Sequence, residues 1–499
     1  MEIRKDKFRT HAGVEIKQRR EMHSVQLRKA NRCTLIVSKR NKLNEAVDTK
    51  LHYDLLMSID QRLYDESTEV QMEVMKSLLE SYKNDCDVIC ALFKKLRTDL
   101  SCNDKVKFEI AYNKEFIPIL VTFIASYNST ISFEAIWSLI NLAAMDKKYS
   151  EEIIRCKGHI KIYQQINNEE LLENSIWLLT NLIEDSKETR NVILTLGFIN
   201  KLIQVLKQKS IKISLLRTIT WSLSCIMKEE SNVEVEDIIT FIKLSETLIE
   251  LEDQEVTQSI LRTFYNLTLT DKHFISSFVN LLPFPIILSQ ATKEHLLALK
   301  VFGNLCQGPQ CFTEIAVRAN IIQAIKSLLV KEGSTEIVME VTWIVANIVY
   351  NAEECIEELF KMGIVDELYK FLYPGVHSDI KDNVISTIVN ICINGSLSQR
   401  QRIAEGEGLL ALILMLDERN DIGLLKKVLE GIESLLSIYE GEYENIYAMR
   451  FDSIGGVERL EDLQMNSDME VFKRTQAILD QYYYSDQTEL DFVLATSQY

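Results

Sequence analysis

Tryptophan and asparagine recur together in this 499-residue chain, four positions apart. The 4 tryptophans precede Asn141, Asn181, Cys225 and Asn347, and they are Trp137, Trp177, Trp221 and Trp343. Two residues four apart lie on one face of a helix, one turn from each other. An indole face attracts cations by about 0.5–2 kcal/mol and packs against the aliphatic stem of Lys or Arg. An amide donates and accepts, so a row of asparagines can hydrogen-bond an extended peptide backbone without regard to its sequence. We call these paired positions the ladder.

The ladder continues at a regular interval where tryptophan is absent. The same Asn position recurs at Asn266, Asn304 and Asn390, and successive members are 40, 44, 41, 38, 43 and 43 residues apart, with Cys225 counted as one of them. Repeats of about 40 residues are typical of armadillo and HEAT arrays, which stack helices into a solenoid. An ordinary helical bundle with accidental similarity is disfavoured, because it gives no reason for a fixed interval.

Each repeat is predicted to contain three helices. A Gly or Asn precedes several apolar helices and allows a sharp turn before them, at Gly158, Gly197, Asn320, Gly363 and Gly408. The third helix carries the ladder, and segments 71–82 and 424–438 fit third helices of terminal repeats. The chain has only 5 Pro and 16 Gly, which favours helices over an all-β fold. The predicted fold is an all-α, right-handed α-solenoid of about ten armadillo repeats.

Two interpretations of the ladder remain open. A helical tryptophan is usually a core residue, so the ladder could be core packing with incidental polar residues. Seven such positions in register, six of them asparagine, favour a concave groove instead, because buried amides need partners. Carboxylates one turn from the ladder, at Glu134, Glu173, Asp185 and Glu340, would give such a groove a preference for basic peptides.

The charge of the chain is divided unevenly. Residues 1–42 hold 13 Lys and Arg against 4 Asp and Glu, a charge of +9, whereas residues 43–499 hold 43 against 69, a charge of −26. A basic arm could bind nucleic acid, a membrane surface, an acidic partner or its own body. The acidic body disfavours nucleic acid. The longest apolar run, Leu409–Leu416, is far shorter than the about 20 residues of a membrane span. We predict no direct nucleic-acid binding and no membrane insertion.

Residues with catalytic or metal-binding spacing are not found. The 7 histidines are isolated from one another and from paired cysteines, so no zinc spacing occurs. The Gly-Glu-Gly at 406–408 opens a predicted helix and does not follow a strand, which disfavours a phosphate loop. We expect no enzyme activity, no metal and no cofactor.

The order of these features resembles the importin alpha family, over nearly the whole chain. The arm resembles an importin-beta-binding segment, with Phe8, Gly13, the pair Arg19 and Arg20, and the run 27–30. Segments 454–464 and 471–483 resemble the last repeat of that family. The resemblance implies an adaptor that shuttles between cytoplasm and nucleus. Its partners would be cargo proteins with Lys/Arg-rich signals, importin beta through the arm, and an export receptor with Ran-GTP.

The resemblance implies a major peptide site in the first half of the ladder. Its matching residues are Trp137, Asn141, Ser150, Trp177, Asn181, Asp185 and Trp221. Asp185 falls where the family pairs a carboxylate with the principal lysine of the signal, and Ser150 takes the place of a threonine beside it. Two residues depart from the family pattern, because Cys225 replaces the third asparagine and Met145 replaces a glycine.

A minor peptide site is implied in the second half. Its matching residues are Lys300, Asn304, Glu340, Trp343, Asn347 and Asn390. Ser386 replaces a tryptophan and Asn383 replaces a glutamate of the family pattern. We therefore expect signals with one basic cluster to use the major site, and the minor site to add little.

The segment Ser38-Lys39-Arg40-Asn41 resembles an internal signal mimic, in which Lys39 and Arg40 would occupy the groove without cargo. The expected organisation is a basic arm at 1–42, a linker leading into the solenoid at 43–64, the repeat array at 65–485 and a short tail at 486–499. An armadillo-repeat scaffold for other protein complexes is the alternative function.

Overall fold

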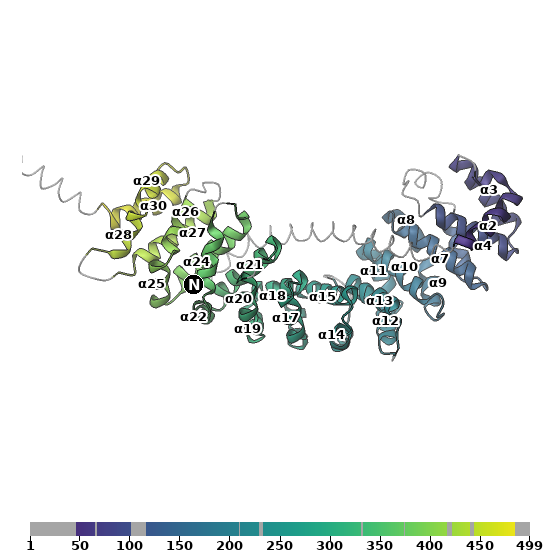
Figure 1. Cartoon of the computed structure of the whole chain (residues 1–499). Coiled ribbons are helices and arrows are strands. Elements are labelled where there is room, and N and C mark those ends of the chain that lie inside the picture. Colours follow the sequence, from purple (N-terminus) through teal and green to yellow (C-terminus); the bar gives the residue numbers. More distant parts are fainter. Residues whose placement is uncertain are drawn as a thin grey trace, which may run out of the picture. The chain divides into compact units, whose positions relative to one another are not determined.

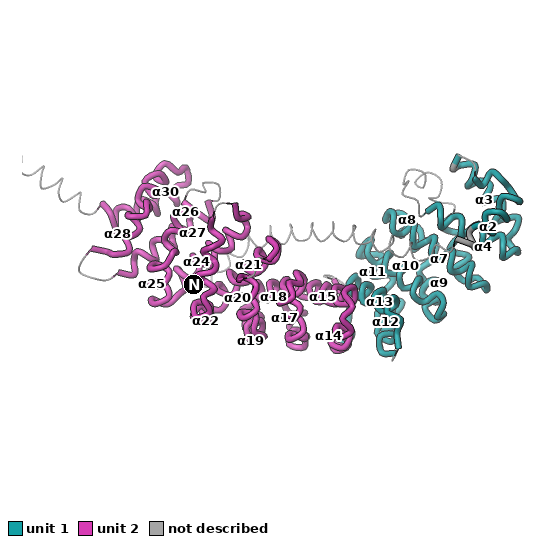
Figure 2. The backbone as a smooth tube through the Cα atoms, in the orientation of Figure 1, with its two compact units in different colours: residues 1–226, 230–237 teal, residues 227–229, 238–499 magenta. Residues whose placement is uncertain are grey.

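The protein is described by a computed structural model that covers residues 46–64, 67–100, 116–208, 210–228, 233–330, 333–373, 375–416, 422–439 and 444–484. Every regular element in these ranges is an α-helix or a short 3-10 helix (Figure 1). The chain divides into two compact units, residues 1–226 with 230–237 and residues 227–229 with 238–499 (Figure 2). The prediction of an all-α fold is confirmed.

Unit 1 contains four successive helices that pack side by side in chain order. These are α4 (Cys86–Asp99), α7 (Ser129–Ala143), α10 (Leu172–Asp185) and α13 (Ile213–Ile226). The elements before α4 are α2 (Ala46–Ile59), η1 (Gln61–Tyr64) and α3 (Thr68–Ser81), and the helices between the four are α6 (Phe116–Phe123), α8 (Lys147–Arg155), α9 (Gly158–Gln165), α11 (Lys187–Leu194) and α12 (Phe198–Leu206). From α7 onward, each helix of the first set is preceded by a shorter helix that packs against it. This is the predicted order within a repeat.

Unit 2 contains six more helices in such a row. They are α15 (Gln254–Thr268), α18 (Leu296–Gln307), α21 (Thr335–Asn351), α24 (Ser378–Asn394), α27 (Ile422–Leu436) and α30 (Met469–Tyr482). The other elements are α14 (Val235–Ile249, which begins in unit 1), α16 (Lys272–Ser276), η2 (Val279–Leu281), α17 (Phe284–Thr292), α19 (Gln310–Arg318), α20 (Ile321–Val330), η3 (Glu353–Cys355), α22 (Ile356–Lys361), α23 (Ile364–Tyr369), η4 (Lys370–Leu372), α25 (Leu397–Glu405), α26 (Gly408–Leu416), α28 (Ile446–Ser453) and α29 (Gly456–Leu463). The described residues thus contain ten third helices, four in unit 1 and six in unit 2.

Local sequence explains where the third helices begin and how the chain turns before them. Asn128 caps α7 by accepting from the backbone N–H groups of Thr130 and Ile131. Gly197 adopts a left-handed backbone with φ of 77° between α11 and α12, as predicted. At the equivalent turn before α9 the left-handed residue is Lys157, one position earlier than the predicted Gly158.

The first third helix differs from the prediction. Segment 71–82 lies in α3, which packs against η1 and α4, whereas α4 itself packs against α7. The third helix of the first repeat is therefore α4, and the assignment of 71–82 was wrong. Residues 46–64, part of the segment 43–64 that was predicted as linker and entry to the solenoid, form α2 and η1, and α2 packs on α4. At the other end, 424–438 falls largely in α27, as predicted, with α30 beyond it.

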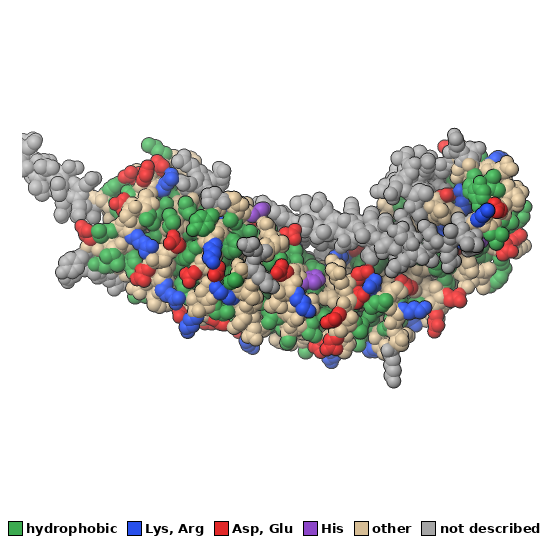
Figure 3. All heavy atoms as spheres, in the orientation of Figure 1, with side chains coloured by type: hydrophobic (Ala, Val, Ile, Leu, Met, Phe, Trp, Pro, Cys, Tyr) green, Lys and Arg blue, Asp and Glu red, His purple; other side chains and the backbone are tan. Residues whose placement is uncertain are grey.

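Within each unit, the inner third helices are buried on most sides because each lies between two others. In α10 every residue from Asn174 to Ile183 is buried. On the face drawn in Figure 3, acidic, basic and apolar side chains of the described residues are interspersed. None of the described helices is long and apolar enough to cross a membrane.

Candidate peptide-binding ladder

The ladder residues of unit 1 come together on consecutive helices. Trp137 and Asn141 lie on α7, Trp177 and Asn181 on α10, and Trp221 on α13. Because α7, α10 and α13 pack side by side, their ladder positions form one row. The sequence interval thus brings these predicted residues together.

In unit 1, ladder side chains also join α7, α10 and α13 each to the third helix before it. The Nδ2 atom of Asn141 donates to the Arg97 carbonyl at 3.3 Å, and that of Asn181 donates to the Ile140 carbonyl at 3.4 Å. The Sγ atom of Cys225 donates to Glu184 Oε1 at 3.1 Å and makes the equivalent link from α13 to α10. The ladder is therefore a structural connection as well as a candidate binding row.

A ladder oxygen on α10 has no hydrogen-bond partner. Asn181 is fully buried, and its Oδ1 atom has no hydrogen-bond partner among the described residues. A buried acceptor without a partner costs about 1–3 kcal/mol. An N–H group of a bound peptide would satisfy it, and the second N–H of the same amide could donate to the peptide carbonyl.

The tryptophan rings of unit 1 are not equally accessible. Trp137 is 5% exposed and Trp177 is 4% exposed, and their centroids lie 5.7 Å apart in an edge-to-face arrangement. Carbon atoms touch at about 3.5–4.0 Å, so an aliphatic stem between two rings needs them about 7–8 Å apart. No aliphatic stem therefore fits between these two rings. Trp221 is half-buried, and no described ring or cation lies against it. The space beside Trp221 is the more open part of the row.

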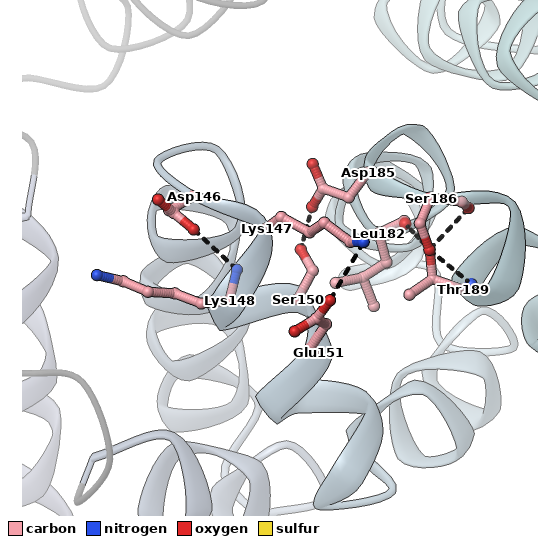
Figure 4. A network of polar contacts seen from close by, with 9 residues as sticks. All are labelled: Asp146, Lys147, Lys148, Ser150, Glu151, Leu182, Asp185, Ser186 and Thr189. Atoms are coloured by element: carbon pink, nitrogen blue, oxygen red, sulfur yellow. Dashed lines mark hydrogen bonds and ion pairs between the residues drawn. The ribbon is translucent and has the colours of Figure 1, made fainter.

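The predicted acidic pocket forms at the end of α10. Asp185 is the last residue of α10 and is half-buried, and Ser150 on α8 donates from Oγ to its Oδ2 atom (Figure 4). The negative end of the α10 dipole adds to the attraction of this carboxylate for a cation. A lysine ammonium, which has three N–H donors, fits the oxygens of Asp185 and Ser150.

The loops around this pocket are held by helix caps. Asp146 caps α8 by accepting from the Lys148 N–H at 2.9 Å, and Ser186 caps α11 by accepting from the Thr189 N–H at 3.1 Å (Figure 4). The Thr189 hydroxyl donates back to the Leu182 carbonyl at 2.6 Å. These bonds fix the segments on both sides of Asp185.

The predicted minor site lies within unit 2, on three consecutive third helices. Lys300 and Asn304 lie on α18, Asn390 on α24, and Glu340, Trp343 and Asn347 on α21. Glu340 is 4% exposed and Trp343 is 7% exposed. The ring of Trp343 lies against Gly303, because a Cβ atom there would be only 2.3 Å from its Cζ3 atom.

The substituted residues of the minor site have structural partners. Asn383 donates from Nδ2 to the Met339 carbonyl and the Thr342 hydroxyl, both at 3.2 Å, and so joins α24 to α21. Ser386 is half-buried on α24, where the family pattern has a tryptophan. The predicted mimic residues Lys39 and Arg40, like the arm and the tail, lie outside the described residues.

Arg97 was missed by the sequence interpretation. It lies on α4, 44 residues before Asn141, and its guanidinium stands over the Trp137 ring at 5.9 Å and pairs with Glu134 at 2.5 Å. Burial raises the pKa of Glu134, and the nearby Arg97 charge opposes that rise. Glu173, another predicted carboxylate, accepts from the Ser214 hydroxyl at 2.8 Å. Extending the ladder interval one step toward the N-terminus would have found Arg97.

No group of three His, Cys, Asp or Glu side chains in the described part of the chain is placed to hold a metal ion. No family model matches the sequence.

The curated relatives of this chain include several importin alpha subunits. Importin subunit alpha-1b of Oryza sativa subsp. japonica is 23% identical over 447 residues, which are 85% of this chain and 82% of the relative. Importin subunit alpha-1a of the same plant is 23% identical, and importin subunit alpha-4 of Arabidopsis thaliana is 24% identical. Each of these two alignments spans 98% of this chain and 93% of the relative.

Among solved structures, a crystal structure of an engineered protein superposes with a TM-score of 0.67 and 19% identity, over 82% of this chain and 98% of that one. At this identity the match concerns the fold alone. The predicted solenoid fold is confirmed, and the chain is an armadillo-repeat protein that is similar in sequence to importin alpha subunits.

Proposed function

We propose that this protein is a nuclear import adaptor, which binds Lys/Arg-rich signals of cargo proteins along the ladder of unit 1. The observation that carries this proposal is the buried Oδ1 atom of Asn181, an acceptor without a partner in the middle of the row. Asp185 lies one turn after Asn181 on α10. The half-buried Trp221 lies on the next third helix, α13. Together they offer a backbone acceptor, an aromatic face and a carboxylate.

This combination suits an extended basic peptide. The peptide backbone would bond to the ladder amide, an aliphatic stem would pack beside Trp221, and a lysine ammonium would meet Asp185 and Ser150. The charge of −26 on residues 43–499 would draw basic peptides toward the row.

The other parts of the proposal rest on sequence. The arm at 1–42 would bind importin beta, and an export receptor with Ran-GTP would return the adaptor, so that it shuttles between cytoplasm and nucleus. The minor site of unit 2 would contribute little, because Ser386 removes one of its aromatic faces.

An armadillo-repeat scaffold for other protein complexes is the second candidate. One observation favours it: Trp137, Trp177 and Trp343 are only 4–7% exposed, as core residues would be. A groove occupied by a segment of the same chain would give equally low exposure, so burial alone does not separate the two functions.

The arm provides the most direct test of the adaptor function. A peptide of residues 1–42, immobilised on a resin, should retain purified importin beta, because its charge of +9 suits an acidic superhelical partner. A shuffled peptide of the same composition is the control. Equal retention by both peptides would count against the adaptor and for the scaffold.

Removal of residues 1–42 should raise the affinity for a lysine-rich peptide by about tenfold, because a tethered competitor acts at an effective concentration on the order of millimolar. It should also increase quenching of tryptophan fluorescence by acrylamide. All 4 tryptophans belong to the ladder, so this signal reports on the candidate groove alone. The Lys39→Ala/Arg40→Ala variant of the full chain should behave in the same way if the mimic is responsible. Unchanged affinity together with unchanged quenching would indicate core tryptophans and no autoinhibition.

A further inference from the structure

Arg97 lies beside Trp137, the first tryptophan of the ladder. Its Cζ atom lies 5.9 Å from the centroid of the Trp137 ring, within the range of a cation–π contact. Its Nε atom lies 2.5 Å from Glu134 Oε2, and its backbone carbonyl accepts from Asn141 Nδ2 at 3.3 Å. One residue of α4 thus contacts the aromatic face, the carboxylate and the amide of one ladder position.

The rest of the Trp137 ring is also enclosed. The ring centroid of Phe133, one turn earlier on α7, lies 5.6 Å from that of Trp137, and the Trp177 centroid lies 5.7 Å from it in an edge-to-face arrangement. Together with Arg97, these contacts leave Trp137 only 5% exposed. Trp221 has no such described neighbours and is half-buried. The first and last tryptophans of this row therefore differ in what already covers them.

The charges at Trp137 are already balanced. Glu134 is 5% exposed, so its carboxylate is paired in a site that water hardly reaches. A second cation entering there would have to displace the Arg97 guanidinium or lie beside it without a free carboxylate. Either arrangement is unfavourable, because like charges repel strongly where screening is weak.

We propose that Arg97 determines the specificity of the row, by supplying from within the chain the cation that a peptide would otherwise place against Trp137 and Glu134. The cargo site then recognises basic side chains from Trp177 onward and takes a neutral side chain beside Trp137. Its ligands are short basic clusters, and a longer cluster gains nothing at this end. This inference rests on the proposed adaptor function.

The test uses the full chain and three peptides. The first has four consecutive lysines between neutral residues. The second carries two further lysines at the N-terminal end of that cluster, and the third carries two further lysines at its C-terminal end. For the natural protein, neither extension should change the dissociation constant by more than about twofold. In Arg97→Gln, extension at one end should tighten binding by about fivefold, because the Trp137 face and the Glu134 carboxylate become available to the added lysine. Arg97→Lys keeps the charge and should behave like the natural protein.

The control variant is Arg318→Ala, which removes an exposed arginine that pairs with Glu314 on α19. It should leave the three affinities in their natural ratio. Helix content by circular dichroism checks the fold of each variant. If Arg97→Gln unfolds, Arg97→Gln/Glu134→Gln takes its place, since it leaves no unpaired buried charge. A gain of at least twofold on extension is then required.

The outcomes distinguish this inference from the proposed function. If binding is retained and the extended peptides gain no more affinity in the folded Arg97 variants than in the natural protein, the role of Arg97 is overturned. The adaptor function is then unaffected. No measurable binding of any peptide to any variant overturns the adaptor function itself, and the inference with it.

Discussion

Asp185→Asn should weaken binding of a lysine-rich peptide by about thirty- to hundredfold, which corresponds to about 2–3 kcal/mol. The substitution removes the charge that would face the principal lysine in the proposed complex, and it keeps the size of the side chain and an acceptor for Ser150. Asp185 is half-buried at the end of α10, so its loss of charge should leave the helices intact. Fluorescence anisotropy of a labelled peptide measures the affinity, and circular dichroism measures the helix content.

The matched control is Glu151→Gln, on the helix that carries Ser150. Glu151 is exposed and pairs with Lys147 at 3.3 Å (Figure 4), and such surface pairs contribute about 0–1 kcal/mol. Its affinity should stay within about twofold of the natural protein. Similar losses in the two variants would mean that the peptide responds to the total negative charge and has no pocket at Asp185.

Trp177→Ala tests the aromatic part of the same site, but it changes both peptide binding and core packing. Trp177 is 4% exposed and contacts Trp137, so its removal also leaves a cavity in the solenoid. Peptide binding should be lost with little loss of helix content, because the remaining third helices still pack on each other. A loss of binding together with a loss of helix content would assign Trp177 to the core.

Gly303→Ala should destabilise the protein by about 1–3 kcal/mol. The new Cβ atom would lie 2.3 Å from Trp343 Cζ3 and 2.5 Å from Glu340 Oε1, distances that real methyl groups do not reach. The Trp343 ring must therefore move away from α18. The midpoint of urea unfolding, followed by circular dichroism, measures the effect.

Gly431→Ala is the matched control, because Gly431 is also a buried glycine within a third helix. Its Cβ atom would meet Leu412 Cδ1 and Val389 Cγ2 at 3.6 Å, which is ordinary contact. The same substitution there should stabilise the helix by up to about 1 kcal/mol. If both variants shift the midpoint in the same direction, the contact between Gly303 and Trp343 does not decide the result.

The Gly303→Ala variant also examines the minor site. Displacing Trp343 should change the affinity for a peptide with two basic clusters by less than about threefold if unit 2 adds little to binding. A loss of a hundredfold would contradict that expectation.

The fold was predictable because the repeat interval constrains many residues at once. The regular interval from Asn141 to Asn390 predicts where each third helix in that range lies. The structure has α7, α10, α13, α15, α18, α21 and α24 at the predicted positions. The first repeat was harder, because α4 has neither Trp nor Asn at its ladder positions. Phe93 and Arg97 stand there instead, and the contact of α4 with α7 identifies them.

The candidate site was less predictable than the fold. The resemblance to importin alpha implied that Ser150 lies beside Asp185, and the structure brings these two side chains into hydrogen-bond contact. Spacing gave no information on ring orientation, so it could not show that Trp137 and Trp177 meet edge to face. It also could not show that the Asn181 side chain donates one N–H to the Ile140 carbonyl, since that bond depends on the distance between neighbouring helices.

The links between third helices bear on how such a protein can change over time. At two positions that depart from the family pattern a donor is still present: Cys225 donates to Glu184, and Asn383 donates to Met339 and Thr342. The hydrogen bond that holds one repeat to the next therefore survives when the side chain that would grip a peptide is replaced. Ligand preference can drift in single positions while the stack of helices stays intact, so divergence in sequence and persistence of architecture are compatible in this array.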